Sequence, residues 1–505
     1  MEAEKDTNDP PAASEIVEQM MMLFDQHGIA YCHWKSNEHA LAAVRGDTDL
    51  DLLFDDKQEV LVGELLKSIG FRLLRAVDYA SYPGIIDFVA LDARALRMIH
   101  VHAHFALRLG EKFVKSYRLP WERQLLETRS RHEQCPLFAA KPELEMMLLL
   151  IRVGLKVRLR DRVARFFGRW SPDNDFVREF VWLRERLNMS EFRSIATALL
   201  GDAYAKAIVD SVLAGPTSEA ILRLRPYSKK TLRPYRTMSV ATAYVSAMRR
   251  ELQLYFRAFL RRKLTLPVPM RRTNPRGGIV IVLLGVDGSG KSTAVRELTR
   301  LLTRKLDVVN VYFGTGEGAG GVLKLLNKIR RPTGRANDAE KYSAPREGKS
   351  PGPIRRAAYM LWAFAAAQQK SAALKKMRKA TGLGQIVLCD RYPQTQFAGI
   401  GDGPLLQQRD GKKFGLMHLV SRYEASVFNR FIATPPGLVL KLKVSAATAF
   451  ARKPGQPSIE VLQRKIEIVE ALRFGANAAV FEIDAERPLR DVVEDLAGHV
   501  WSQYR

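Results

Sequence analysis

The chain has 505 residues, more than one hydrophobic core usually serves, so two or three domains are expected. Hydrophobic residues make up 47% and charged residues 27%, a balance that excludes disordered, collagen-like and disulfide-framework proteins. The formal net charge of +26 favours anionic partners. Three cysteines without metal or disulfide spacing, and an acidic N-terminus unlike a secretory signal, predict a reducing, cytoplasmic location.

Composition and periodicity divide the chain into five segments. Residues 1–15 contain two prolines and no periodicity, which predicts a disordered tail. Residues 16–138 alternate short apolar runs with helical patterns, as in an α+β domain, and residues 139–266 show helical spacing with many arginines, which predicts a basic helical domain. The Pro- and Gly-containing stretch 267–278 predicts a linker, and residues 279–505 predict an α/β domain with a parallel sheet.

Two carboxylates in the first domain lie on one face of a predicted strand. Asp49 and Asp51 are two residues apart, and such a pair can hold a divalent metal for a nucleoside triphosphate. This pattern resembles the nucleotidyltransferase superfamily, in which a Gly-Ser pair precedes the carboxylates; here Lys35 and Ser36 stand in its place. The resemblance implies a metal site at Asp49 and Asp51. The alternative is a solvated strand end on a domain without nucleotidyl transfer.

The resemblance also implies a third carboxylate on a later strand. The strand predicted over residues 98–105 carries His100, His102 and His104 on one face instead, and Asp87 is the other candidate for that role. The three histidines suit either a Zn²⁺ site or a hydrogen-bonded strand face.

The excess positive charge is concentrated in the segment 221–272, which contains fourteen basic residues and one acid, Glu251. Within it, residues 248–263 predict an amphipathic helix. The apolar side chains expected on one face of this helix are Leu252, Tyr255, Phe256 and Phe259. They predict either packing against the helical domain or contact with an anionic membrane surface or nucleic acid.

Residues 285–292, which we call the phosphate loop, read GVDGSGKS and fit the pattern G-x-x-x-x-G-K-[ST]. An apolar strand precedes the loop, and a helix follows from Thr293, so backbone N–H groups and the helix dipole are expected to bind phosphate. Lys291 is expected to reach the β and γ phosphates of ATP, and Ser292 to ligate Mg²⁺. The residues predicted to bind ATP are Gly285, Asp287, Gly288, Ser289, Gly290, Lys291, Ser292 and Thr293.

A second candidate site residue is predicted where the apolar run 385–390 ends in a carboxylate. Asp390 at the carboxyl end of a buried parallel strand is expected to face the phosphate loop and to share Mg²⁺ with Ser292. Arg391 follows it and suits the clamping of an anionic acceptor.

The phosphate loop, followed by CDRYPQTQFAG at residues 389–399, resembles the thymidylate kinase family, and the likeness covers about 225 residues. The resemblance implies that Asp287 contacts the sugar of the acceptor, and that Asp390 and Arg391 act in catalysis together with Lys291. Basic residues at the end of the helix predicted over 446–453 take the place of the family's lid. The further residues implied for acceptor binding are Tyr392 and Thr395, and those implied for the lid are Arg452 and Lys453.

Two departures from the family concern the acceptor. The stretch 311–321 lacks the arginine that holds the monophosphate, and Gln369 stands where a second acceptor arginine is usual. Arg330, Arg331 and Arg346 are the candidates to replace them.

Together these motifs predict an ATP- and Mg²⁺-dependent phosphotransferase that acts on a nucleoside monophosphate or a similar phosphorylated acceptor. Two alternatives stay open from the sequence. One is a kinase of a sugar or glycan intermediate. The other is a nucleotide-gated protein that binds nucleic acid or a membrane surface through residues 221–272.

Overall fold

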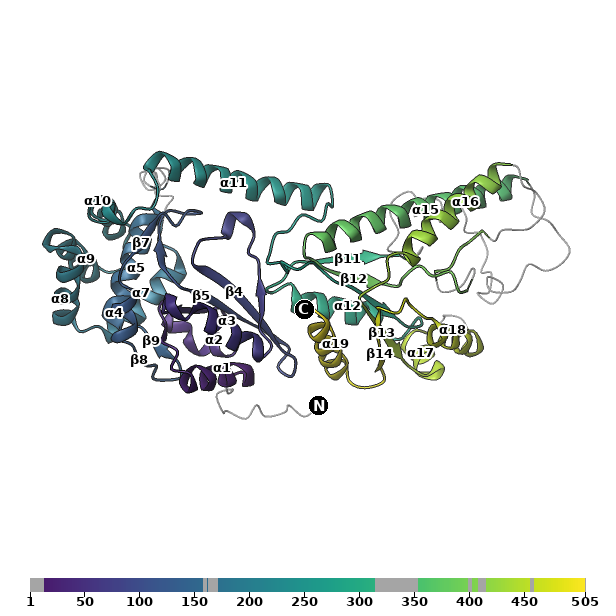
Figure 1. Ribbon diagram of the computed structural model, residues 1–505, viewed down its shortest axis with the longest axis horizontal. Helices are drawn as coiled ribbons and strands as arrows, with labels where there is room; N and C mark the ends of the chain where they lie inside the picture. The colour runs from purple at the N-terminus through teal and green to yellow at the C-terminus, as the bar shows by residue number, and fades with distance from the viewer. Residues whose placement is uncertain are drawn as a thin grey trace. The chain divides into compact units, whose positions relative to one another are not determined.

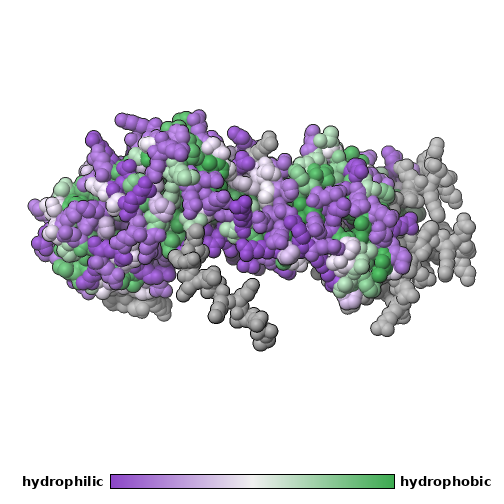
Figure 2. Space-filling model, turned by 90° about the horizontal axis from the view of Figure 1, so that it is seen from below, coloured by the Kyte–Doolittle hydropathy of each residue, from purple (hydrophilic) through white to green (hydrophobic). Residues whose placement is uncertain are grey.

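The computed structural model describes residues 13–157, 161, 171–313, 353–397, 402–406, 415–454 and 458–504. The chain divides into two compact units, Met1–Phe259 (unit 1) and Leu260–Arg505 (unit 2), which are drawn in Figure 1. No helix among the described residues is long and apolar enough to cross a membrane. On the face shown in Figure 2, hydrophilic residues predominate and hydrophobic ones gather in separate patches.

The described residues of unit 1 form a mixed seven-stranded sheet in the order β3-β4-β5-β2-β1-β9-β8. Its central pair, β2 and β5, is parallel, whereas β4–β5 and β1–β2 are antiparallel. The strands are β1 (Tyr31–His33), β2 (Leu50–Phe54), β3 (Arg72–Leu74), β4 (Ile85–Asp92), β5 (Arg97–His104), β8 (Ser130–Arg131) and β9 (Phe138–Ala139), and a separate pair is formed by β6 (Leu107–Leu109) and β7 (Tyr117–Leu119). Mixed pairing with flanking helices fits the predicted α+β character of this region.

The helices of unit 1 become more frequent toward its C-terminal half. They are α1 (Glu15–Gln26), α2 (Ala40–Val44), α3 (Glu59–Ser68), α4 (Glu122–Glu127), α5 (Pro142–Lys156), α7 (Asn174–Arg186), α8 (Met189–Leu200), α9 (Asp202–Ala214), α10 (Ser218–Thr231) and α11 (Val240–Lys263), whose last four residues belong to unit 2. The predicted tail ends earlier than expected, because Glu15 already begins α1 and the Ser14 hydroxyl donates to Asp92 at 2.6 Å. The helical spacing of residues 139–266 is thus realised as helices.

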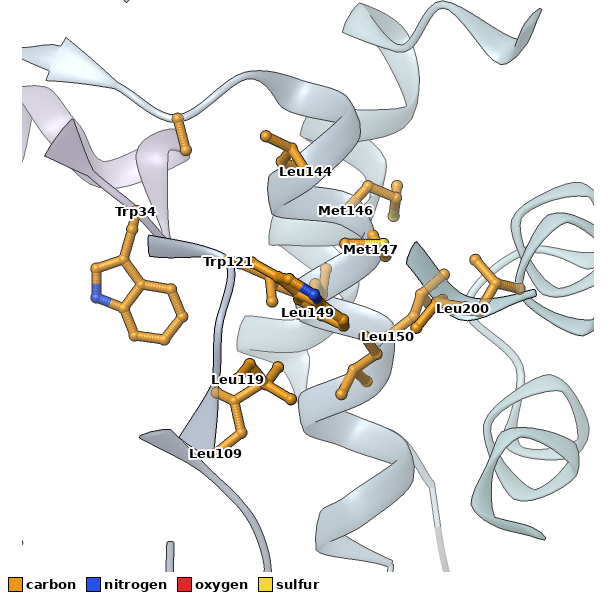
Figure 3. Close-up of a cluster of buried hydrophobic side chains, with 14 of the residues drawn as sticks. Trp34, Leu109, Leu119, Trp121, Leu144, Met146, Met147, Leu149, Leu150 and Leu200 are labelled. Carbon is orange, nitrogen blue, oxygen red and sulfur yellow. The ribbon is translucent and has the colours of Figure 1, made fainter. Parts of the chain in front are cut away.

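Helix α5 joins the helical segment to the sheet through a shared core. Eleven of its fifteen residues are buried, which is the pattern of a helix surrounded by protein. Figure 3 shows Leu144 and Leu149 of α5 in one cluster with Trp34 and Trp121 from the strand side and with Leu200 of α8. Because one core contains both sets of residues, the predicted boundary near residue 138 falls inside unit 1.

The described residues of unit 2 form a five-stranded sheet in the order β11-β12-β10-β13-β14, with all neighbours parallel. The strands are β10 (Val280–Leu284), β11 (Val308–Tyr312), β12 (Ile386–Asp390), β13 (Leu438–Lys443) and β14 (Ala479–Asp484), and the helices are α12 (Lys291–Leu302), α15 (Pro353–Gly382), α16 (Leu416–Ile432), α17 (Ala446–Arg452), α18 (Ile459–Ala471) and α19 (Leu489–Gln503). The α/β class with a parallel sheet, expected from the unbroken apolar runs, is confirmed.

Helices cover both faces of this sheet (Figure 1). Val280, Val282 and Leu284 of β10 pack in one core with residues of α15 and α16. Side chains alternate along a strand, so Ile281 and Leu283 point to the opposite face, where α12 and α19 contact the sheet and each other. The strand β10, with helices on both sides and strands at both edges, is therefore buried throughout.

The predicted linker 267–278 is fixed to unit 2 by one buried carboxylate. Asp307 Oδ2 accepts the backbone N–H groups of Met270 at 2.6 Å and Arg271 at 2.9 Å. Its Oδ1 accepts Arg261 Nη1 and Gln385 Nε2, both at 2.6 Å, and the Asp307 side chain is 1% exposed. A carboxylate with four donors satisfies its hydrogen-bonding capacity, so this stretch is an integral part of unit 2.

We expect Asp307→Ala to destabilise unit 2 by about 2–4 kcal/mol, because it leaves three N–H donors and the partly exposed Arg261 guanidinium without their acceptor. The control is Asp495→Ala, which removes the exposed ion pair with Arg487 and should cost at most about 1 kcal/mol. Calorimetric unfolding of the full chain measures both. Equal losses of stability in the two variants would contradict the role assigned to Asp307.

Candidate functional site

The phosphate loop and Asp390 are brought together by the register of two parallel strands. Leu283 of β10 pairs with Asp390 of β12, so the loop that leaves β10 starts beside the carboxylate that ends β12. The Ser292 hydroxyl donates to Asp390 Oδ2 at 3.2 Å. The other oxygen, Asp390 Oδ1, is buried and accepts no hydrogen bond from the residues that the structure describes. The structure therefore joins the two residues that the sequence predicts as metal ligands.

The backbone conformation of the phosphate loop depends on its glycines. Gly288 has φ +86°, and a Cβ added there would lie 2.2 Å from the backbone oxygen of Ala449 in α17. Gly290 has φ +85° and is the N-cap of α12, so the N–H groups of the helix N-terminus open toward the loop. Gly285 passes close to Ser289, whose buried Oγ has no hydrogen-bond partner among the described residues. This arrangement is typical of a backbone cradle for an anion.

The side chain of Lys291 lies under the phosphate loop, and its ammonium group is held at the loop's backbone. Its side chain is buried, and Nζ donates to the backbone oxygen of Val286 at 2.6 Å. Burial lowers the pKa of Lys291 to about 8, and the nearby Arg391 guanidinium acts in the same direction. Ser292, by contrast, is exposed, and Thr293 is half-buried. A buried ammonium group that donates to a carbonyl is well suited to pair with an incoming phosphate.

Asp287 lies between two cations. Its Oδ1 is 3.0 Å from Arg391 Nη2, and its Oδ2 is 3.2 Å from Lys465 Nζ in α18. Burial alone would raise the pKa of Asp287, but Lys465, Arg391 and Lys291 outweigh that effect and hold the pKa below its ordinary value. The carboxylate is therefore charged at neutral pH and fixes the positions of both cations.

Arg391 has an unusual backbone that matches its position. Its φ is +71°, a conformation that non-glycine residues seldom adopt and that is concentrated at functional sites. The guanidinium contacts Asp287 on one side and lies 3.8 Å from Asp402 on the other. The strained backbone and the two acids together aim the side chain back across the end of the sheet.

The other residues implied by the family resemblance lie in different surroundings. Tyr392 is buried among aromatic rings, and its hydroxyl donates to the backbone oxygen of Thr434 at 2.5 Å. Thr395 is exposed in the loop after β12. Arg452 donates from Nη1 to the backbone oxygen of Ala485 at 2.8 Å, and Lys453 is exposed at the end of α17. Tyr392 is thus packed in the core, and the acceptor role of Tyr392 and Thr395 and the lid role of the two basic residues stay predictions.

Two cations, one beside Asp287 and one in electrostatic contact with Asp402, have no signature in the sequence. Lys465 carries no motif and became visible only when α18 was placed beside the loop. Lys370 in α15 is 5% exposed and interacts electrostatically with Asp402, the second partner of Arg391. It follows Gln369, so the position expected to lack a cation has one next to it. Arg330, Arg331 and Arg346 lie outside the described residues.

The polar cluster in unit 1 differs from a pair of carboxylates sharing one metal. His100 lies between Asp49, at 2.9 Å from Nδ1, and Asp87, at 2.7 Å from Nε2. Asp49 and Asp87 are thereby held by the same imidazole. Asp87, the candidate for the third carboxylate, therefore contacts β5 through His100.

Asp51 is engaged separately. Its Oδ1 is 2.8 Å from Lys35 Nζ, 3.0 Å from His102 Nδ1 and 3.4 Å from His104 Nε2. Burial favours a raised pKa for Asp51, but Lys35 and the two histidines outweigh it and hold the pKa well below the usual value. Asp51, His102 and His104 offer ligand atoms within 4.8 Å of one another, a nitrogen-rich set that suits Zn²⁺ better than Mg²⁺. Lys35 contacts the same oxygen, Asp51 Oδ1. A strand face held together by hydrogen bonds therefore explains the cluster as well as a metal site does.

Comparison with known proteins places the chain among relatives that share less than half of its length. No family model matches it. It is 30% identical over 224 residues, 43% of this chain and 89% of the relative, to the Escherichia coli K12 protein named "Uncharacterized ATP-binding protein YghS". It is 27% identical over 219 residues, 43% of this chain and 84% of the relative, to the "Uncharacterized ATP-binding protein YghR" of the same strain. Because the match to YghS covers most of that protein, this chain belongs to the YghS family.

Proposed function

We propose that the chain is an ATP- and Mg²⁺-dependent phosphotransferase whose acceptor is a phosphorylated, sugar-containing molecule such as a nucleoside monophosphate. The observation that carries the proposal is the phosphate loop of unit 2, with Lys291 buried beneath it and Ser292 bonded to Asp390. The name of YghS, an ATP-binding protein, supports the nucleotide part of the proposal. The positive cluster around Asp287 supports the acceptor part.

The residues present fit a magnesium ion. Mg²⁺ prefers oxygen ligands and is usually held by one or two protein oxygens together with water and phosphate. Ser292 Oγ and Asp390 Oδ2 are 3.2 Å apart, and Asp390 Oδ1 lacks a hydrogen-bond partner in the described part of the chain. These two residues would hold the ion. The chemistry supplied by a bound Mg²⁺ is neutralisation of charge on the phosphate oxygens.

The chain's own residues would bind and orient the triphosphate. The N–H groups of the phosphate loop and of the first turn of α12 donate to phosphate oxygens, as the helix dipole favours. Lys291 exchanges its bond to the Val286 carbonyl for a charge-assisted bond to phosphate, which is the stronger of the two. Catalysis in this class of reaction comes mainly from such positioning and charge stabilisation.

The acceptor would bind where Asp287 and its cations meet. A carboxylate that remains charged can accept a hydrogen bond from a sugar hydroxyl, and Arg391 and Lys465 can attract a phosphate. Lys465 would offset one of the arginines absent from the family pattern. A charge-assisted hydrogen bond contributes about 1.5–3 kcal/mol, so this lysine would matter for affinity. A nucleoside monophosphate presents both groups that this site can recognise.

The proposal is tested by measuring ATP consumption against a panel of nucleoside monophosphates and sugar phosphates. We expect transfer to at least one of them, and Lys291→Ala should reduce the rate by about 10²–10³-fold because a charge beside the phosphates is lost. Lys379→Ala removes an exposed lysine of the same unit and should leave the rate unchanged. Equal rates for the two variants would remove the phosphate loop from the reaction.

The metal assignment predicts a changed magnesium requirement. Asp390→Asn keeps the size of the side chain but removes its charge, so we expect the Mg²⁺ concentration for half-maximal activity to rise at least about tenfold. Asp484→Asn is the matched control, because Asp484 also ends a strand of this sheet and is exposed. A magnesium titration of both variants decides the point, and an unchanged requirement for Asp390→Asn would place the ion elsewhere.

The cluster in unit 1 is predicted to be independent of phosphoryl transfer. Asp49 and Asp51 belong to unit 1, whereas the phosphate loop belongs to unit 2. We therefore expect the double variant Asp49→Asn with Asp51→Asn to retain the wild-type rate of ATP consumption, once thermal unfolding has shown that unit 1 stays folded. A large loss of rate in the folded variant would show that the two sets of residues serve one reaction.

A further inference from the structure

Helix α11 exposes its apolar side chains instead of burying them. The structure describes every residue of this helix, and Ala243 is the one that is buried. Eight large apolar residues are between 50% and 71% exposed: Val240, Tyr244, Val245, Met248, Leu252, Tyr255, Phe256 and Phe259. An exposed apolar patch of this kind usually marks an interaction site.

The eight residues form a stripe along one side of the helix, which also carries the half-buried Glu251. At 3.6 residues per turn, successive residues are rotated by about 100°, which places all eight within an arc of roughly 160°. The stripe extends from Val240 to Phe259 on α11, the long teal helix of Figure 1. Side chains scattered singly would need no explanation, but a stripe of aromatic and aliphatic residues along five turns of one helix does.

Arginines hold the opposite side of α11 to unit 1. Arg250 donates from Nη1 to the backbone oxygen of Phe113 at 3.0 Å and from Nη2 to that of Ser81 at 3.2 Å. Arg257 Nη2 is 2.6 Å from Asp78 Oδ2. The usual orientation of an amphipathic helix is therefore reversed: its polar side faces the protein and its apolar side faces out.

The positive charge of the helix and of the whole chain indicates which kind of partner binds the apolar stripe. Arg249, Arg262 and Lys263 are exposed on the same helix, and the formal net charge is +26. A second copy of the chain would bring the same positive charge against this surface. Nucleic acid would match the cations but leave the apolar stripe in water. An anionic phospholipid surface satisfies both, because the apolar stripe enters the acyl boundary and the cations contact the headgroups.

We propose that α11 docks the protein on an anionic phospholipid membrane, with its apolar stripe inserted at the level of the headgroups. Tyr255 and Phe256, toward the C-terminal end of the stripe, have the aromatic character favoured in that layer. The arginine bonds of Arg250 and Arg257 keep the helix attached to unit 1 while the stripe faces the lipid.

The experiment is flotation of the full chain with vesicles of phosphatidylcholine alone or of an equal mixture of phosphatidylcholine and phosphatidylserine. The wild type is expected to float with the mixed vesicles, and less at high salt. Phe256→Ser with Phe259→Ser should weaken partitioning at least about tenfold, because two large apolar side chains are lost. The control, Val60→Ser with Leu213→Ser, removes apolar residues of α3 and α9 that are at least as exposed on average, and this variant should bind as the wild type does.

The charge contribution is measured with Arg249→Glu together with Arg262→Glu, which should remove the preference for phosphatidylserine. Thermal unfolding verifies that each variant remains folded, as expected for exposed positions. Wild-type partitioning of the Phe256→Ser, Phe259→Ser variant would overturn the proposal. The proposal would also be overturned if the wild type did not bind vesicles but formed a dimer that the Phe256→Ser, Phe259→Ser variant abolishes. The same holds if the wild type did not bind vesicles but bound RNA, and the variant weakened that binding.

Discussion

The parallel pairing of β10 with β12 is the constraint on which the candidate site depends. Parallel strands end at the same edge of a sheet, so a loop that follows one strand and a carboxylate that ends the other must meet there. The pairing of Leu283 with Asp390 sets the distance, and the Ser292–Asp390 hydrogen bond is its consequence. A slip of one residue would turn Asp390 to the other face of the sheet and separate the two.

The strands place the backbone of the site, and charge interactions position its side chains. Lys291, Arg391 and Lys465 repel one another, and the carboxylate of Asp287 offsets that repulsion. The strained backbone of Arg391 adds to the same effect, since the structure around it must compensate for an unfavourable φ. Groups that are already oriented lose little freedom when an anion arrives, so the site is organised before binding. Phosphate oxygens would replace partners that the chain now supplies itself.

Features encoded by neighbouring residues could be predicted from the sequence, and features formed by distant ones could not. The phosphate loop, the strand ending in Asp390 and the α/β class depend on short motifs and on apolar runs, and the structure contains them. The contact of Lys465 with Asp287 joins residues that are 178 positions apart in the sequence, and no local pattern predicts it. Asp307 was overlooked for the same reason, because its donors come from separate segments. Tyr392 matched a motif, yet its hydroxyl donates to the backbone oxygen of Thr434, after the end of α16.

Helix α11 shows a further limit on inference from periodicity. A hydrophobic stripe predicts an amphipathic helix but does not say which side faces the protein. The answer depends on acceptors elsewhere in the chain: the carbonyl groups of Ser81 and Phe113 and the carboxylate of Asp78 bind the arginine side. These acceptors belong to the strand-rich part of unit 1, far earlier in the sequence. The orientation of the stripe is therefore a property of the fold of unit 1, and it is this orientation that makes the apolar side chains available to a lipid surface.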